Sequence, residues 1–498
     1  MINGVKNITV VSYLNKKYRM MQMGKYNLIL VVLWMLAISC SGTKTYLKNN
    51  RHNPAAKELS ENNLRRAIEI VDSAFVNYFD LNEMAMSRFY NAFTGNKSEE
   101  TGSVWMYTAA IESVNNILKA LQWQKENGIV HLYKNHYHRY LDMLHKLYEG
   151  LDYYKGTFVL TSYTQTKEWS IYGVHRSRIK NEAKVEGIEN VYDDQMWLVR
   201  ELLQSFKITQ DKRFLEHAEY LTSYVLDGWD CTIDENGEER GGIPWGPGYV
   251  SKHSCSNGPM VSPLVWLHEY YENKNEPIEH RFIDVADGVS RKEEQQKKSD
   301  YYLLFAKKIY DWQKRHLLRE DGVYDDMMGG CNPKNPEIKN INGTDYRVGI
   351  LCKDRIGPAI SYNSGTMISG ASDLFRATAD DRYHKEGKEL AGSSFGYFAK
   401  LDKDIVGCYS YASDGFNNWF NGVLLRSYVD FRTYDPEIAD FIRTFQKNLD
   451  YGYEHFLTRG TLPHDLLKGW EGNPDERNVE GMFMFAFGAE YAELAGIK

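Results

Sequence analysis

Apolar residues recur along most of the chain at the three- and four-residue spacing of amphipathic helices. Leu64, Ile68, Val71 and Phe75 form one such stripe, and another runs from Tyr137 to Leu151. This spacing places the apolar side chains on one helix face. Alternating patterns of comparable strength, which would indicate paired strands, do not appear. Ten further segments are predicted as helices: 104–121, 194–206, 212–227, 258–271, 300–317, 364–378, 382–398, 418–433, 437–457 and 477–495.

Short turns of a shared sequence type join several of these predicted helices. Residues 209–214 and 378–383 both read Thr-x-Asp-x-Arg-aromatic, and Thr433–Pro436 is a looser copy. The aspartate of each turn is expected to cap the N-terminus of the helix that follows. Repetition of a helix–short turn–helix unit six times predicts an all-α fold, a closed (α/α)6 barrel of about twelve helices. An open helical solenoid is the alternative.

Longer segments rich in glycine and aromatic residues alternate with the short turns. These segments, 155–191, 228–257, 326–361 and 399–417, are expected together on the face opposite the tight turns. Long loops on one face of a rigid scaffold are where functional sites are built. The charged segment 275–299 reads instead as a surface insertion, which we expect to be a solvated excursion without function.

The N-terminal region has the pattern of an export signal. Lys25 precedes the apolar run 28–38, which is too short to span a bilayer and suits a secretory signal peptide. The run ends in Leu-Ala-Ile-Ser-Cys, which resembles a bacterial lipobox with Cys40 as the lipid-modified residue. We therefore expect a signal peptide over 1–39, with a start later than Met1 as the alternative, and a polar lipidated tether over 40–57. The helical barrel domain is then expected over 58–498.

Composition and charge exclude several classes of protein. The chain has 498 residues, 43% of them hydrophobic and 26% charged, with a net charge of −7. These values match a folded globular protein and exclude a disordered or polytopic membrane protein. The acidic balance, without a block of basic residues, also argues against a nucleic-acid partner. The 36 tyrosines suit both a helical core and a sugar-binding surface.

Cysteine and histidine spacing does not indicate a metal site or a cofactor. Five cysteines follow Cys40, an odd number without a C-x-x-C pair, so they do not form a disulfide framework, although one or two bridges are compatible with the count. The histidines lack the H-E-x-x-H or H-x-H spacing of metal ligands. No metal and no cofactor are expected.

The candidate chemistry lies at the start of one predicted helix. The segment Tyr192-Asp193-Asp194-Gln195-Met196-Trp197 places two adjacent carboxylates where a loop enters a helix. The helix N-terminus stabilises a carboxylate anion, whereas two close carboxylates resist ionising together, so the pKa of one of them is expected to rise. An ionised carboxylate beside a protonated one is the equipment of a glycosidase. A helix cap with a solvated charge is the alternative reading of this pair.

This Y-D-D-x-x-W segment resembles the signature of glycoside hydrolase family 76, the endo-α-1,6-mannanases. Four other segments resemble later landmarks of that family in the same order along the chain, so the resemblance covers about residues 60–495. Two departures are Pro244, where the family has a larger residue, and Asn421, where it often has lysine. The four segments are Gly241–Trp245 with Ser256–Pro259, Asp321–Asp325, Tyr362–Thr366 and Phe420–Arg426.

The resemblance implies hydrolysis of α-1,6-mannosidic bonds with retention, by endo action in a groove at one end of an (α/α)6 barrel. Carried over by position, Asp193 is the nucleophile and Asp194 the acid/base. The second Tyr-Asp-Asp, which follows a predicted helix, is expected to supply a sugar-hydroxyl contact from Asp325 or a structural turn. The remaining expected substrate-binding residues are Tyr192, the platform candidates Trp105, Trp197, Trp245 and Tyr362, and the hydroxyl-binding candidates Asn257 and Asn363.

The expected partner is α-mannan polysaccharide or oligosaccharide, bound by a monomer that meets the membrane only through its lipid anchor. A glycan-binding lipoprotein of the outer membrane without catalysis is one alternative. Another sugar enzyme on an (α/α)6 barrel is the second, and a transglycosidase of the same family is the third. The periplasmic face is the preferred location over the cell surface, because no acidic run follows Cys40.

Replacement of Cys40 tests the expected lipid anchor. Cys40→Ala removes the residue that would be acylated, so the variant is expected in the soluble fraction, whereas the unmodified chain stays with membranes. Fractionation followed by immunoblotting measures this. Unchanged membrane association of the variant would refute the lipobox.

Overall fold

The computed structural model describes residues 54–497. The predicted signal peptide, Cys40 and residues 40–53 of the predicted tether lie outside these residues. Residues 61–497 form one compact unit. Residues 1–60 belong to a second unit, of which the structure describes residues 54–60, the first turns of helix α2 (Pro54–Tyr78). Helix α2 begins at Pro54, within the predicted tether, and proline suits the first position of a helix.

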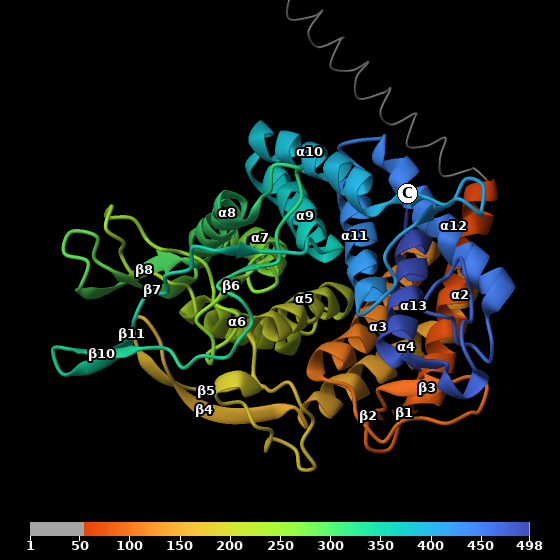
Figure 1. The fold of residues 1–498 in the computed structure, drawn as a ribbon, viewed down its shortest axis with the longest axis horizontal. Helices are drawn as coiled ribbons and strands as arrows, with labels where there is room; N and C mark the ends of the chain where they lie inside the picture. The colour runs from red at the N-terminus through yellow and green to blue at the C-terminus, as the bar shows by residue number, and fades with distance from the viewer. Residues whose placement is uncertain (1–53, 498) are drawn as a thin grey trace, which may run out of the picture. The chain divides into compact units, whose positions relative to one another are not determined.

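The described residues contain twelve α-helices, the number that the apolar pattern predicts (Figure 1). Each predicted helix is present, with ends that differ by a few residues. In chain order the helices are α2 (Pro54–Tyr78), α3 (Val104–Glu126), α4 (His131–Leu151), α5 (Tyr192–Thr209), α6 (Lys212–Asp227), α7 (Val261–Tyr271), α8 (Lys298–Leu317), α9 (Ser361–Thr378), α10 (Asp381–Phe398), α11 (Asn417–Phe431), α12 (Ile438–Phe456) and α13 (Gly481–Ala495).

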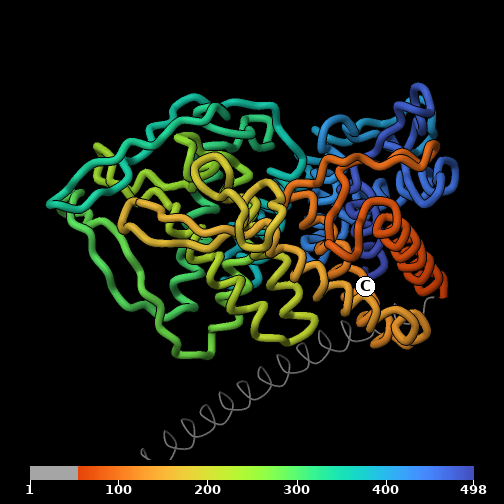
Figure 2. Tube along the Cα trace, turned by 90° about the horizontal axis from the view of Figure 1, so that it is seen from below, coloured from red at the N-terminus to blue at the C-terminus, as the bar shows by residue number. Residues whose placement is uncertain are grey.

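Six of these helices form a closed inner ring. Helix α3 packs against α5, α5 against α7, α7 against α9, α9 against α11, α11 against α13, and α13 back against α3. The intervening helices α4, α6, α8, α10 and α12 each pack outside a neighbouring inner helix. Asn63 and Arg66 of α2 bond to Gln446 and Asp450 of α12, so the first and last outer helices of the barrel lie side by side (Figure 1 and Figure 2). The predicted (α/α)6 barrel is confirmed.

Burial separates the inner helices from the outer ones. Every residue of α13 is buried, and α3 and α9 are buried over most of their length. The outer helix α12, in contrast, buries one apolar stripe that includes Ile442, Phe445 and Leu449. A helix that is buried on all sides must be surrounded by other elements, whereas an amphipathic helix covers them. Burial thus distinguishes these inner helices from the outer one.

The tight turns lie where an inner helix passes into an outer one. Asp211 accepts a hydrogen bond from the Arg213 amide, and Asp380 accepts one from the Arg382 amide, so both predicted caps are confirmed. Asp435 accepts from the Glu437 amide, one residue before α12 begins at Ile438. Each of these turns is short because it joins two antiparallel neighbours.

The predicted long loops contain small β-sheets that the sequence pattern does not reveal. Segment 155–191 holds a seven-residue hairpin of β4 and β5, and segment 275–299 is a second hairpin of β7 and β8. The latter corrects the expected solvated excursion, because Ile283 and His280 of β7 are buried. The strands are β1 (Phe79–Asp80), β2 (Ala85–Met86), β3 (Phe89–Asn91), β4 (Lys155–Thr161), β5 (Thr166–Tyr172), β6 (Lys252–His253), β7 (Pro277–Ile283), β8 (Arg291–Lys297), β9 (Met327–Met328), β10 (Ile338–Ile341), β11 (Thr344–Arg347), β12 (Arg355–Ile356), β13 (Lys400–Leu401), β14 (Tyr409–Ser410) and β15 (Asn478–Glu480).

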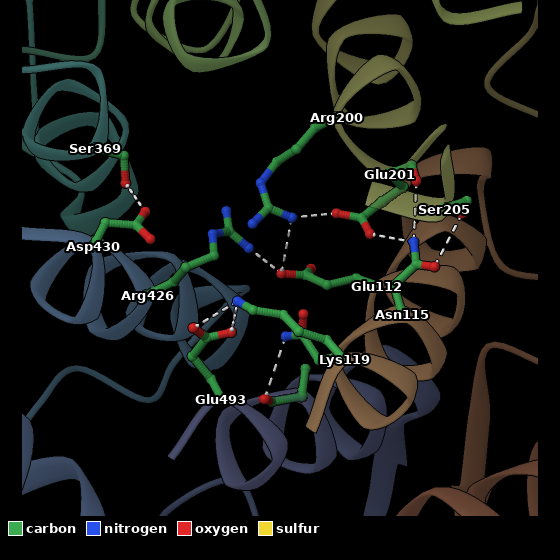
Figure 3. A network of polar contacts seen from close by, with 12 residues as sticks. Glu112, Asn115, Lys119, Arg200, Glu201, Ser205, Ser369, Arg426, Asp430 and Glu493 are labelled. Carbon is green, nitrogen blue, oxygen red and sulfur yellow. Dashed lines mark hydrogen bonds and ion pairs between the residues drawn. The ribbon is translucent and has the colours of Figure 1, made fainter. Parts of the chain in front are cut away.

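A buried polar network ties the inner helices together (Figure 3). Glu112 of α3 bonds Arg426 of α11 and lies 4.0 Å from Arg200 of α5, which also pairs with Glu201. Asn115 of α3 donates to Glu201 at 2.9 Å. Each charge in this group has an opposite charge or a donor, as buried charges require.

The five cysteines within residues 54–497 are unpaired. No helix in that stretch has the length and apolar character needed to cross a membrane.

Removal of one network charge should destabilise the barrel strongly. Arg426→Ala leaves Glu112 buried without its closest cation, which typically costs about 3–5 kcal/mol. The midpoint of denaturant unfolding is expected to fall accordingly. Arg315→Ala, which breaks the exposed pair with Glu238, serves as the control and should leave the midpoint nearly unchanged. Equal midpoints for the two variants would contradict a structural role for the network.

Candidate active site

The six inner helices begin at the same end of the barrel, where the long connections lie. The connections from outer to inner helices run over 79–103, 152–191, 228–260, 318–360, 399–416 and 457–480. The predicted common face for the long loops is therefore confirmed. Helix N-termini carry a partial positive charge, so this end of the barrel favours anionic side chains.

Asp193 and Asp194 lie in the first turn of α5, as the sequence predicts. The residue at the N-cap is Val191, whose side chain cannot cap the helix, so the two carboxylates are the acidic groups of that turn. The amide of Tyr192 donates to the Trp245 carbonyl at 2.8 Å. This bond fixes the start of α5 against the loop that follows α6.

Burial perturbs both carboxyl groups. It raises the pKa of Asp193 above its ordinary value of 3.8, while a hydrogen bond from the Cys255 thiol acts to lower that pKa. Burial raises the pKa of Asp194 further, and the negative charge of Asp193 adds to the effect. One oxygen of Asp193 is buried and has no hydrogen-bond partner within residues 54–497. The pair is arranged so that Asp193 ionises first and Asp194 keeps its proton.

Cys255 connects this pair to a third carboxyl group, that of the half-buried Asp326. The charges of Asp193 and Asp326 both raise the pKa of the Cys255 thiol, whose largest perturbation is burial. The Tyr362 hydroxyl at the start of α9 hydrogen bonds to the same sulfur. The side chain of Asn363 donates to Asp326 at 3.4 Å, and burial raises the pKa of Asp326 to about 6.

A three-stranded sheet brings these residues together from distant parts of the chain. Strand β9, directly after Asp326, pairs with β6 and with β12. The amide of Ser254 donates to the Asp326 carbonyl at 2.8 Å, which places Cys255 beside Asp326. The buried pair of Asp230 with Lys252, at 2.8 Å, anchors the loop that carries β6.

The predicted aromatic platforms fall into two groups. Trp245 is half-buried, contributes a hydrogen bond that lowers the pKa of Asp193, and stacks on His253 with ring centroids 4.7 Å apart. Trp105 is also half-buried at the start of α3, where it stacks on Phe420. The Trp105 indole N–H is buried without a partner in the described residues.

The other predicted aromatic residues are packed inside the protein. Trp197 contacts Trp419 edge-on at 4.8 Å, and Tyr362 stacks on Phe420 at 4.7 Å while its hydroxyl reaches the carboxylate cluster. Tyr192 packs on Tyr224, away from the pair. Tyr362 is therefore the member of this group that contacts the cluster.

Asn257 and Asp325, two of the predicted substrate contacts, bond to other parts of the protein and not to the carboxylate cluster. Asn257 is fully buried, and its amide bonds to the backbone of Ile243 and His253 at 2.8–3.0 Å, so it holds the loop and has no polar group directed at a ligand. Asp325 lies 3.5 Å from Arg319 and 3.8 Å from Arg355. Within the second Tyr-Asp-Asp, the carboxyl group that joins the cluster is that of Asp326.

The residues that the sequence analysis left out of the site are Asp326 and Cys255. Asp326 stands beside Asp325 in the sequence, but the alternation of the chain into β9 turns the two side chains apart. The β6–β9 pairing that brings Asp326 and Cys255 together links residues more than seventy positions apart. No local pattern carries that signal.

Among residues 54–497, no group of three or more histidine, cysteine, aspartate or glutamate side chains is placed to hold a metal ion.

Residues 290–455 match the model of glycosyl hydrolase family 76. No curated protein matches the sequence. Solved structures do match the fold. A family 76 mannosidase from Bacteroides thetaiotaomicron shares 19% identity over 87% of this chain and 98% of its own, with a TM-score of 0.63.

A second similar structure is an inactive variant of an α-1,6-mannanase from Salegentibacter sp., in complex with α-1,6-mannotetrose. In that variant two consecutive aspartates are replaced by alanine. It shares 18% identity over 88% of this chain and 99% of its own, with a TM-score of 0.58. An α-mannanase of family 76 from B. thetaiotaomicron shares 15% identity, with a TM-score of 0.59 over 87% of this chain and 95% of its own.

The carboxyl pair predicts a bell-shaped pH dependence of its chemistry. Activity should fall as the pH drops through the raised pKa of Asp193 and again as it rises through the higher pKa of Asp194, so both limbs lie above pH 3.8. Cys255→Ala removes a donor to ionised Asp193 and should move the acid limb to higher pH, whereas Cys255→Ser keeps a donor and serves as the control. The pH profile of kcat/KM measures both. An acid limb unmoved by Cys255→Ala would contradict the assigned thiol contact.

Proposed function

Since residues 290–455 match the model of glycosyl hydrolase family 76, we propose that the chain is a member of this family and cleaves α-1,6-mannosidic bonds within mannan backbones by a retaining, endo-acting mechanism. The observation that carries this proposal is the Asp193–Asp194 pair at the N-terminus of an inner helix, where Asp194 is buried and Asp193 is partly exposed. Two carboxyl groups held at different pKa values are what a retaining glycosidase needs.

The inactive Salegentibacter variant supports the choice of this pair, because two consecutive aspartates were replaced there. This chain contains three pairs of consecutive aspartates. In the pair that starts at Asp380, the first carboxylate caps α10 and the second is exposed. In the pair that starts at Asp325, the first carboxylate lies beside two arginines. Asp193 and Asp194 are the pair at the start of an inner helix, on the face of the long loops.

In the proposed first step, ionised Asp193 attacks the anomeric carbon while Asp194 protonates the leaving oxygen. The glycosidic bond breaks and a covalent mannosyl-aspartate forms. Asp194, now ionised, then takes a proton from water, which attacks the anomeric carbon and releases Asp193. The Cys255 and Trp245 donors favour the ionised form of Asp193, as a nucleophile requires.

The half-buried Trp245 and Trp105 are the proposed sugar platforms, because part of each ring remains accessible. An indole ring offers an apolar face for the C–H groups of a pyranose and one N–H donor at its edge. Asn363 and Asp326 are the proposed partners of sugar hydroxyls, since the side-chain amide oxygen of Asn363 is buried without a partner among the described residues.

Incubation with linear α-1,6-mannan tests the proposed activity. Endo cleavage should yield a ladder of short oligosaccharides that shortens with time. Asp193→Ala is expected to abolish cleavage, because no covalent intermediate can form, and Asp194→Ala to lower it by about 10²–10⁴-fold through loss of proton donation. Asp381→Ala, an exposed aspartate in the first turn of α10, is the control and should retain full activity.

Other product patterns separate the alternatives. Mannose as the sole product would contradict endo action, and the absence of any release would contradict the glycosidase assignment. Elongated products without net hydrolysis would indicate a transglycosidase. Full activity of Asp193→Ala would show that the nucleophile has been assigned to the wrong residue.

A further inference from the structure

A polar cavity lies outside the inner ring, separate from the Asp193–Asp194 site. It has a volume of about 220 Å³ and is lined by the β4–β5 hairpin, the end of α6, the β7–β8 hairpin and the start of α8. None of its lining residues belongs to the carboxylate cluster around Asp193. The β7–β8 hairpin, which is the charged insertion of the sequence, forms one wall.

We propose that this cavity binds one neutral sugar residue and so forms a second glycan site beside the catalytic one. The walls combine buried polar groups that lack partners with several aromatic rings. The choice of a mannose-type sugar rests on the proposed function, whereas the assignment of a neutral sugar rests on the cavity itself.

Four polar atoms lining the cavity are buried without a hydrogen bond of regular geometry among residues 54–497. They are the Tyr163 hydroxyl, the His280 Nδ1 atom, the Trp169 indole N–H and the Oδ2 atom of Asp227, whose pKa the indole N–H lowers. Tyr163 and Trp169 are each only 1% exposed. A buried polar group without a partner costs free energy, so its presence in a cavity indicates a ligand that supplies the missing bond. The set contains both donors and acceptors, which suits hydroxyl groups.

Asp227 is held in a fixed orientation toward the cavity. Its Oδ1 atom accepts from the Ser162 hydroxyl at 3.0 Å and from the Gln165 amide at 2.8 Å, both in the turn between β4 and β5. Two donors therefore fix one oxygen, and the other oxygen remains available to a ligand. A carboxylate oriented in this way can accept bonds from sugar hydroxyls without further loss of conformational entropy.

The charges around the cavity are already balanced. Glu239 pairs with Lys308 at 2.8 Å and accepts from the Trp229 indole at 3.1 Å. Arg281 pairs with Glu279 and Glu293. Lys167 lies over the Trp169 ring at 4.0 Å and lowers the pKa of Asp227, although burial raises it overall. An anionic ligand would be repelled by Asp227 and a cationic ligand by Lys167, so a neutral ligand fits best.

Aromatic rings supply the apolar part of the cavity wall. Trp229 contacts Phe305 edge-on at 6.1 Å, and Tyr301 packs on Phe305 at 4.8 Å. His280 adds a ring from β7, with its Nδ1 atom 3.6 Å from Glu294. Rings that flank a few fixed polar groups match a pyranose, which has apolar C–H faces and a polar rim.

The cavity is connected to the catalytic pair through packed rings. Trp169 contacts Tyr224 at 5.4 Å, and Tyr224 contacts Tyr192 at 5.0 Å, one residue before Asp193.

Calorimetric titration of α-1,6-mannotriose into the Asp193→Asn, Asp194→Asn variant of the full chain tests this proposal, because the ligand is then not cleaved. Two molecules are expected to bind per chain. Added Tyr163→Phe should weaken one binding event by about three- to tenfold, and added Asp227→Asn by about tenfold or more. Tyr346→Phe, which removes a hydroxyl from β11 outside the cavity, is the matched control.

The outcomes distinguish the two proposals. A single binding event, or two events unaffected by either cavity variant, would overturn the second site even if the unmodified chain cleaves mannan. Binding of glucosamine but not of mannotriose at the Asp227-dependent site would overturn the neutral-sugar assignment. A Tyr163-dependent sugar site in a chain that does not cleave mannan would support the cavity and contradict the proposed function. Unchanged melting temperatures exclude misfolding of the variants.

Discussion

Closure of the six inner helices into a ring is the constraint on which the rest of the structure depends. The contact of α13 with α3 completes that ring and buries the inner helices on almost every side. Because the inner helices alternate along the chain with antiparallel outer helices, all six inner helices run in one direction. Their N-termini therefore meet at one end, where the long loops add side chains from every sector of the ring. The buried network of Glu112, Arg200 and Arg426 bonds helices across this ring.

The same closure determines the chemistry of the carboxyl groups. Asp193 and Asp194 are withdrawn from water by the loops that cover the ring, so the pKa of each is raised. The donors from Cys255 and Trp245 limit this effect at Asp193, whereas the charge of Asp193 adds to it at Asp194. Two chemically identical neighbours thus acquire different protonation states. Ion pairing of Asp230 with Lys252 stabilises the loop that delivers Cys255.

Local sequence patterns were sufficient to predict the helices and the aspartate pair, because both depend on short-range spacing. Asp211 and Asp380 cap their helices through bonds to an amide two residues away. The role of Asp326 was not predictable in this way, since it follows from the pairing of β9 with β6. Asn257 shows the converse difficulty: its position in a site-facing loop suggested a ligand contact, but the loop backbone occupies its amide. The β7–β8 hairpin was missed because its charged residues mask a two-stranded pairing.

The central claim is that Asp193 is the nucleophile and Asp194 the acid/base. Mass spectrometry of the Asp194→Ala variant after reaction with an aryl α-mannoside tests it most directly. An acidic aryl leaving group needs little protonation, so the first step should proceed while the second is slow. The account predicts a single mannosyl adduct, located on Asp193 after proteolysis. An adduct on Asp325 or Asp326, or release of mannose of inverted configuration without any adduct, would contradict it.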